Sequence, residues 1–310
     1  MLSGNYNYQY MDWSHSKIQG EDFKHEGNLV TNLITPTITI GLSDYLNISY
    51  QQALGVRAMD WGRAEESGHH RSEDSLSDFL DQAEGSLFGD ARINLKYLLT
   101  NTGLQPGSRI FLGMGLTIPS NSVLKESPFL DVVYDEDGMP VENSHRHFSL
   151  SDGAYKANLE LQYYIKNSSK SIFIPAFYGL TANYIKPLNE SKYGYKPSTT
   201  YIGVGSCLFS TQLKNIWAPK GISLGLAFLK TEEAYWDELP APNSKTEVFI
   251  PSLGMIWSHK DYGSLSVNLK YNKNEVIPEA GDGIENESTS FEISVGYRKT
   301  LNYSIPWLYY

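Results

Sequence analysis

The chain has 310 residues, a formal net charge of −10 and only 19% charged residues. This acidic balance, without a basic stripe to neutralise phosphates, argues against a nucleic-acid partner, and the single cysteine, Cys207, excludes an intrachain disulfide and any multi-cysteine metal site. No apolar run is long enough for a membrane-spanning helix. The 22 Tyr, 12 Phe and 6 Trp nevertheless supply the rings that membrane interfaces favour, so a membrane protein with this sequence would have to cross with strands.

Alternation of apolar and polar residues over nine or more positions predicts strands long enough to cross a bilayer core. The pattern is clearest at residues 155–165, where Leu159 and Leu161 fall on one face and Asn158 and Glu160 on the other. In chain order, the predicted strands are residues 4–14, 28–41, 46–58, 86–100, 108–120, 147–166, 171–186, 198–212, 220–232, 246–258, 263–273 and 288–300.

The connections between these strands alternate between short turns and longer, mostly acidic loops, with both termini on the side of the short turns. This layout is typical of an outer-membrane barrel, in which the even number of strands follows from the closed sheet. The strands of a soluble sandwich would also alternate between apolar and polar residues, but they are usually shorter. The polar face here carries Arg92, Lys96, Lys156 and Lys270, which are too many charges for the dry core of a sandwich. We therefore predict an all-β fold, a transmembrane antiparallel up-and-down β-barrel of about twelve strands that forms a single domain over residues 1–310.

The chain does not open with the basic start, apolar stretch and cleavage site of a secretory signal. We interpret it as a mature chain of the bacterial outer membrane from which the signal peptide has been removed. Its expected partners are outer-membrane lipid, lipopolysaccharide and a small-molecule solute.

Several segments resemble the outer-membrane β-barrel transporter family associated with the meta-pathway of phenol degradation. The resemblance lies in Gly41 to Ser49, Gly89 to Tyr97, Gly113 to Pro119, and His147 to Tyr155 with its Leu150-Ser151-Asp152-Gly153. These segments lie mainly in the middle third of the chain and consist mostly of strand and turn patterns. The resemblance implies a barrel that moves small and often hydrophobic molecules across the outer membrane.

Polar positions of the alternating strands would project into the barrel, where mixed charges could line a water-filled path with some preference for anions. The candidate lumen-lining residues are Arg57, Arg92, Asn94, Lys96, Lys156, Asn158, Glu160, Gln162, Lys270, Glu292 and Arg298. The alternative is that these long side chains pair into a network that fills the barrel. We also expect the glycines of Gly113-Met114-Gly115 and Gly203-Val204-Gly205 to face inward and widen the lumen.

Histidines in two long loops on the same rim could converge on a divalent metal, the weak candidates being His69, His70, His145 and His147. Loop spacing does not enforce such a site, and the alternative is that these are solvated loop residues. No cofactor is expected.

A His-x-Ser pair, His147 and Ser149, precedes the alternating segment at 155–165. Counting by twos from Leu159 places both residues on the lipid-facing side near the loop rim, where the imidazole could act as general base for the hydroxyl. This arrangement resembles that of outer-membrane phospholipases, although the chain has no Asn-Gly after the serine and no evident third residue to orient the histidine.

Three functions follow from these observations. The first, a non-enzymatic one, is a porin-like outer-membrane channel for passive transport of small molecules, including hydrophobic or aromatic ones. The second is a lipid hydrolase that uses His147 and Ser149. The third is a plugged structural or docking barrel whose acidic loops bind a metal or a partner.

Overall fold

The computed structural model describes residues 1–15, 25–61, 87–102, 105–123, 149–169, 171–213, 215, 217–241, 244–276 and 286–303. Within these residues there is no helix long and apolar enough to cross a membrane. The regular secondary structure of the described residues consists of strands.

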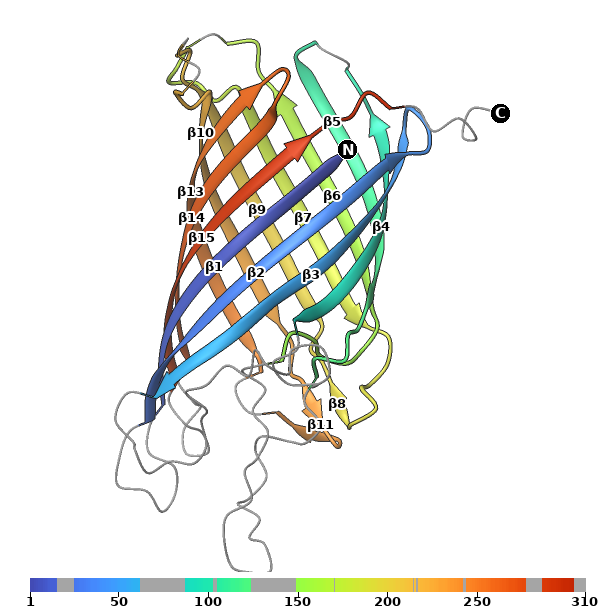
Figure 1. Cartoon of the computed structure of the whole chain (residues 1–310), viewed down its shortest axis with the longest axis vertical. Helices are drawn as coiled ribbons and strands as arrows, with labels where there is room; N and C mark the ends of the chain where they lie inside the picture. Colours follow the sequence, from blue (N-terminus) through green and yellow to red (C-terminus); the bar gives the residue numbers. More distant parts are fainter. Residues whose placement is uncertain are drawn as a thin grey trace, which may run out of the picture.

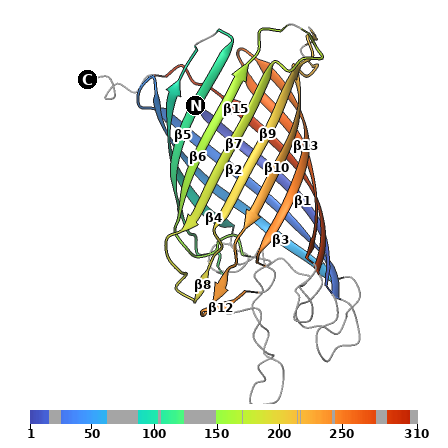
Figure 2. The same ribbon diagram turned by 180° about the vertical axis from the view of Figure 1, so that it is seen from behind.

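Twelve antiparallel strands close into a barrel in the order β1-β15-β14-β13-β10-β9-β7-β6-β5-β4-β3-β2 (Figures 1 and 2). Their bounds are β1 (Leu2–His15), β2 (His25–Gly41), β3 (Leu46–Trp61), β4 (Phe88–Thr100), β5 (Gly107–Ile118), β6 (Lys156–Lys166), β7 (Phe177–Pro187), β9 (Thr200–Ser210), β10 (Gly221–Thr231), β13 (Thr246–His259), β14 (Gly263–Val276) and β15 (Asn286–Lys299). The barrel closes where β1 pairs along its whole length with β15, from Leu2 against Lys299 to His15 against Asn286. Closure gives each strand of the barrel a hydrogen-bonded neighbour on both sides, as a sheet in hydrocarbon requires.

The predicted fold class is confirmed, and each predicted strand corresponds to one strand of the barrel. Two strands begin six or more residues later than expected. The strand predicted from residue 147 begins at Lys156, because Gly153 adopts a φ of +72° and turns the chain just before it. The strand predicted from residue 171 begins at Phe177, after Pro175, which has no N–H to donate to a ladder.

The outer surface of the barrel is apolar and exposed. Met114 is 59%, Leu159 56% and Leu180 57% accessible in the isolated chain, because their side chains point away from the sheet. Tyrosines pair near both ends of this surface: Tyr45 and Tyr97 lie 6.4 Å apart at the short-turn rim, and Tyr184 and Tyr201 lie 5.3 Å apart at the opposite rim. An apolar band between aromatic girdles is the surface that a bilayer solvates.

The two rims differ as the sequence predicted. The chain begins at the short-turn rim, where the Met1 ammonium donates to the Thr39 carbonyl at 2.8 Å, and β15 returns to that rim beside Leu2 (Figure 1). The opposite rim carries the longer connections. We call it the loop rim.

A small three-stranded sheet stands on the loop rim beyond the barrel (Figure 2). It contains β8 (Tyr195–Lys196), β11 (Tyr235–Trp236) and β12 (Leu239–Pro240), which lie in segments expected to be loops. Tyr195 and Trp236 pack with ring centroids 5.2 Å apart, and the turn between β11 and β12 places Asp237 and Glu238 at positive φ. The nearby Glu233 carboxylate accepts a hydrogen bond from the Tyr235 hydroxyl and thereby raises the pKa of Tyr235.

Candidate functional site: the barrel lumen

Side chains that alternate with the exposed apolar ones point into the barrel. The space around the inward glycines shows how close the inward side chains of neighbouring strands lie to one another. A Cβ built on Gly113 would lie 3.0 Å from both the Cβ and Oε2 of Glu160, and one built on Gly179 would lie 3.0 Å from the Tyr164 ring and 2.8 Å from the Ser206 hydroxyl. Inward positions of neighbouring strands therefore face one common interior, which we call the lumen.

All eleven candidate lumen residues lie on strands at inward positions. By strand they are Arg57 on β3; Arg92, Asn94 and Lys96 on β4; Lys156, Asn158, Glu160 and Gln162 on β6; Lys270 on β14; and Glu292 and Arg298 on β15. Their number on β4 and β6 concentrates the polar groups on one side of the barrel.

Two ion pairs form among these residues. Lys270 and Glu292 are direct cross-strand neighbours, and Nζ lies 2.8 Å from Oε1. Lys96 and Glu160 are two strands apart but meet at 3.3 Å, because both are in register with Gly113, which has no side chain to separate them. Gln162 also donates to Glu160. The interior is thus partly paired, although neither pair joins opposite walls of the barrel.

Arg92 and Arg298 are exposed although both point inward. Neither has a partner among the residues that the structure describes. Arg298 lies near the short-turn rim, opposite Ser3 and Ser264, whereas Arg92 lies in the half of β4 nearer the loop rim. Accessible cations therefore stand at two levels of the lumen.

Three further charged side chains point inward that were not predicted from the sequence. Arg109 lies an even number of residues from the inward Gly113 on β5, and Lys166 an even number from the inward Glu160 on β6. Asp90 lies two residues before the inward Arg92 on β4. Counting by twos to the strand ends would have found all three. The Phe111–Tyr164 pair, with ring centroids 6.2 Å apart, was also missed, because two aromatic residues on the polar face do not stand out in an alternating pattern.

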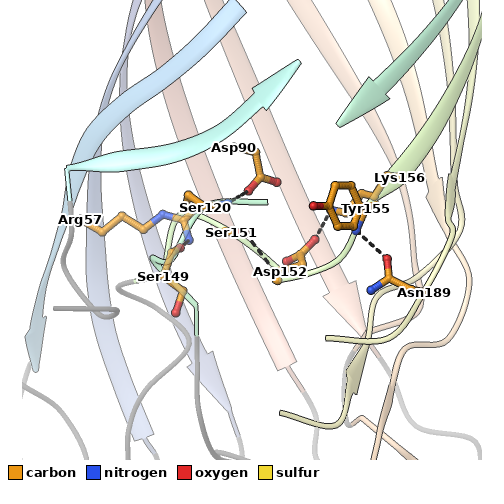
Figure 3. Close-up of polar contacts among 10 residues, drawn as sticks. Arg57, Asp90, Ser120, Ser149, Ser151, Asp152, Tyr155, Lys156 and Asn189 are labelled. Atoms are coloured by element: carbon orange, nitrogen blue, oxygen red, sulfur yellow. Dashed lines mark hydrogen bonds and ion pairs between the residues drawn. The ribbon is translucent and has the colours of Figure 1, made fainter. Parts of the chain in front are cut away.

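A non-strand segment, residues 149–155, lies across the inside of the barrel at the loop rim (Figure 3). The Arg57 Nη1 donates to the Ser149 carbonyl at 2.6 Å, and the backbone N–H of Leu150 donates to Oγ of the fully buried Ser122 at 3.1 Å. Asp152 pairs with Lys156. These contacts tie the segment to β3 and β6.

Asp90 connects the same segment to β4. Its carboxylate accepts from the backbone N–H of Ser120 at 3.2 Å and is hydrogen-bonded by the Ser151 side chain. Figure 3 shows Asp90, Ser120 and Ser151 gathered between the strands. Polar contacts with β3, β4 and β6 thus hold residues 149–155 inside the barrel, where this segment narrows the lumen at the loop rim.

The placement of Ser149 on a lipid-facing strand was wrong. Ser149 precedes the strand that begins at Lys156, is only 7% exposed, and is held inside the barrel through its carbonyl by Arg57. Its hydroxyl is buried and has no hydrogen-bond partner among the described residues. His147 lies outside those residues. Counting every second residue back from Leu159 gave the wrong face, because the count passed the turn at Gly153, where the strand has already ended.

The histidines proposed as metal ligands, His69, His70, His145 and His147, all lie outside the described residues. Within the described part of the chain, no three His, Cys, Asp or Glu residues lie close enough together to hold a metal ion.

The expected orientation of Gly203 and Gly205 was also wrong. A Cβ built on either glycine would have nothing within 4 Å, and their neighbour Tyr201 faces outward. Gly113 and Gly115, by contrast, point inward against Glu160 and Asn94. The outward Gly203 instead helps to form a groove of about 820 Å³ on the outer surface, lined also by Ala182, Tyr184 and Tyr201.

No family model matches the sequence, and no curated protein matches it. The structure is similar to that of the COG4313 outer membrane channel from Pseudomonas putida F1, with a TM-score of 0.56, 12% sequence identity, and coverage of 96% of this chain and 94% of that one. This similarity concerns the fold, a closed antiparallel β-barrel.

Two other solved structures are similar at lower scores. A Pseudomonas aeruginosa FadL homologue has a TM-score of 0.43 and 10% identity over 96% of this chain and 89% of its own. The TodX deltaS2S3 mutant monoaromatic hydrocarbon channel has a TM-score of 0.45 and 8% identity over 97% of this chain and 90% of its own.

Proposed function

We propose that the protein is a single-domain outer-membrane channel for the passive passage of small molecules, including hydrophobic or aromatic ones. The observation that carries this proposal is the inversion of the usual protein surface. Exposed apolar side chains such as Leu159 cover the outside, whereas Arg92 and Arg298 are exposed inside. Bare cations inside a barrel need water around them, because an unpaired charge in a dry interior is prohibitively costly.

The apolar outer surface and its tyrosine girdles support a location in a bilayer. In the outer membrane, the loop rim would face outward, since outer-membrane barrels place their longer loops on the extracellular side. Lipid and lipopolysaccharide would then surround the barrel. The similarity to an outer membrane channel supports the same placement.

A second candidate, a plugged barrel that serves as a structural or docking element, is favoured by one observation. The Arg57–Ser149 contact holds residues 149–155 inside the loop rim, where they narrow the path. The two functions differ in conductance.

The test is to reconstitute the folded protein in planar bilayers and measure current in 1 M KCl, with parallel liposome-swelling assays using small neutral solutes. The channel predicts discrete conductance steps and solute-dependent swelling. A folded, membrane-inserted barrel with neither signal would overturn the channel and leave the plugged barrel.

A further inference from the structure

The described side chains that point into the lumen carry a net charge opposite in sign to that of the whole chain. On β3 to β6, the inward cations are Arg57, Arg92, Lys96, Arg109, Lys156 and Lys166. The carboxylates on the same wall are Asp90, Glu160 and Asp152 of the inward segment, so the described part of this wall has three more cations than carboxylates. The chain as a whole carries −10. We call β3 to β6 the cationic wall.

The remaining inward charges do not reverse this balance. On β14 and β15, Lys270 and Glu292 neutralise one another, and Arg298 adds one more cation. No charged residue occupies an inward position of β7, β9, β10 or β13.

Those four strands instead form an apolar wall. Ile202, Leu229 and Val248 stand in direct register across β9, β10 and β13, and Val204, Ala227 and Ile250 form the next rung. Val248 is 6% exposed. The rungs are not an outer surface, because on β9, β10 and β13 the side chains of opposite parity, such as Tyr201, Leu226 and Phe249, are the ones exposed outside.

The two walls meet at one level of the barrel. Ile202 is in register with Asn183, and Asn183 with Glu160, which pairs with Lys96 across Gly113. A molecule at this level can therefore touch aliphatic side chains and a cationic cluster together. The Phe111–Tyr164 pair lies on the adjoining strands β5 and β6, toward the short-turn rim.

We propose that the preferred solutes are amphiphilic anions, each with one carboxylate and an apolar aromatic or alkyl body. This inference rests on the proposed channel function and specifies its substrate class. The excess of cations favours a carboxylate over an ammonium group, since charge of one sign lining a confined path concentrates the opposite ion. The aliphatic rungs bury the apolar body, which gives about 25 cal/mol for each Å² removed from water. A sugar would not use the rungs, and a neutral hydrocarbon would not use the cations.

The test compares probes of one shape and different charge in the reconstituted full-length protein. Benzoate and benzylammonium are matched in their ring, and acetate controls for charge without an apolar body. Bi-ionic reversal potentials give their relative permeabilities. We expect benzoate to permeate on the order of tenfold better than benzylammonium, and better than acetate despite its larger size.

Substitutions on each wall separate the contribution of the cationic wall to charge selectivity from that of the apolar wall to the passage of the aromatic ring. Arg92→Glu should reduce the preference for benzoate over benzylammonium, whereas Lys186→Glu, the same charge change at an exposed outward position of β7, should leave it unchanged. Leu229→Ser should reduce benzoate permeation and leave that of acetate unaltered. Arg92→Gln provides a milder form of the first change, and heat-modifiable gel migration verifies that each variant is folded.

Equal or greater permeation of benzylammonium through a conducting protein would overturn the inference and leave the channel function intact. The same holds if Lys186→Glu changes selectivity as much as Arg92→Glu does. Absence of any conductance would overturn the channel function and the inference together.

Discussion

Two adjacent residues of β6 test which face of the sheet meets lipid. Leu161 points outward and is 46% exposed, and Gln162 points inward and donates to Glu160. Leu161 lies at the centre of the strand (Lys156–Lys166), which places it near the bilayer midplane. Arginine on the lipid face at that depth costs about 2–4 kcal/mol. The Leu161→Arg variant should therefore lose a factor of about 30 to 900 in its folding equilibrium constant, at 1.36 kcal/mol for each tenfold change.

Gln162→Arg is the matched control, because it introduces the same side chain one residue away. There the guanidinium replaces an amide that already contacts the Glu160 carboxylate, in the polar lumen. We expect a change of less than about 1 kcal/mol, the range of an exposed ion pair.

The assay is equilibrium urea unfolding in lipid vesicles, followed by tryptophan fluorescence and by heat-modifiable gel migration. Equal destabilisation by Gln162→Arg and Leu161→Arg would refute the proposed orientation of the sheet, because the two faces would then be equally dry. A larger cost for Gln162→Arg would mean that the assignment of the faces is reversed.

Two further predictions concern the loop rim. Arg57→Ala removes the 2.6 Å hydrogen bond to the Ser149 carbonyl and should release residues 149–155 from β3, so single-channel conductance should rise; unchanged or lower conductance would show that this segment does not restrict the path. Gly194→Ala should destabilise the small sheet by about 1–3 kcal/mol, because Gly194 has a φ of +89° and its new Cβ would meet the Asp237 carboxylate. Limited proteolysis should then cut residues 191–199 and 232–241 faster while the barrel keeps its heat-modifiable migration, and an unchanged cleavage rate would contradict the predicted strain.

The strands of the barrel could be predicted from the sequence because the alternation of apolar and polar residues is visible within each strand. At residues 155–165, alternation places Leu159 and Leu161 opposite Asn158 and Glu160, and every strand long enough to show this pattern was found. The small sheet on the loop rim was not predicted, since β8, β11 and β12 are two residues each and depend on Tyr195 packing against Trp236 across the chain.

The lumen was less predictable, because hydrophobicity alone does not reveal which face points inward. On β9, Gly203 and Gly205 face outward while Ile202 and Val204 face the lumen, the reverse of the expected arrangement. The parity of this strand is fixed by its pairing with β7, which sets Tyr201 beside the outward Tyr184. The apolar wall could therefore be recognised only from the register of the closed sheet.

A channel of this kind requires water inside the barrel and hydrocarbon around its outer surface. Ser206 is exposed on the inner face of β9, and the next residue, Cys207, is the chain's only cysteine and points outward. In protein reconstituted into liposomes, a charged thiol reagent should modify Ser206→Cys in a Cys207→Ser background and leave native Cys207 unmodified. Rapid modification of Cys207 together with protection of the cysteine introduced at position 206 would contradict the account.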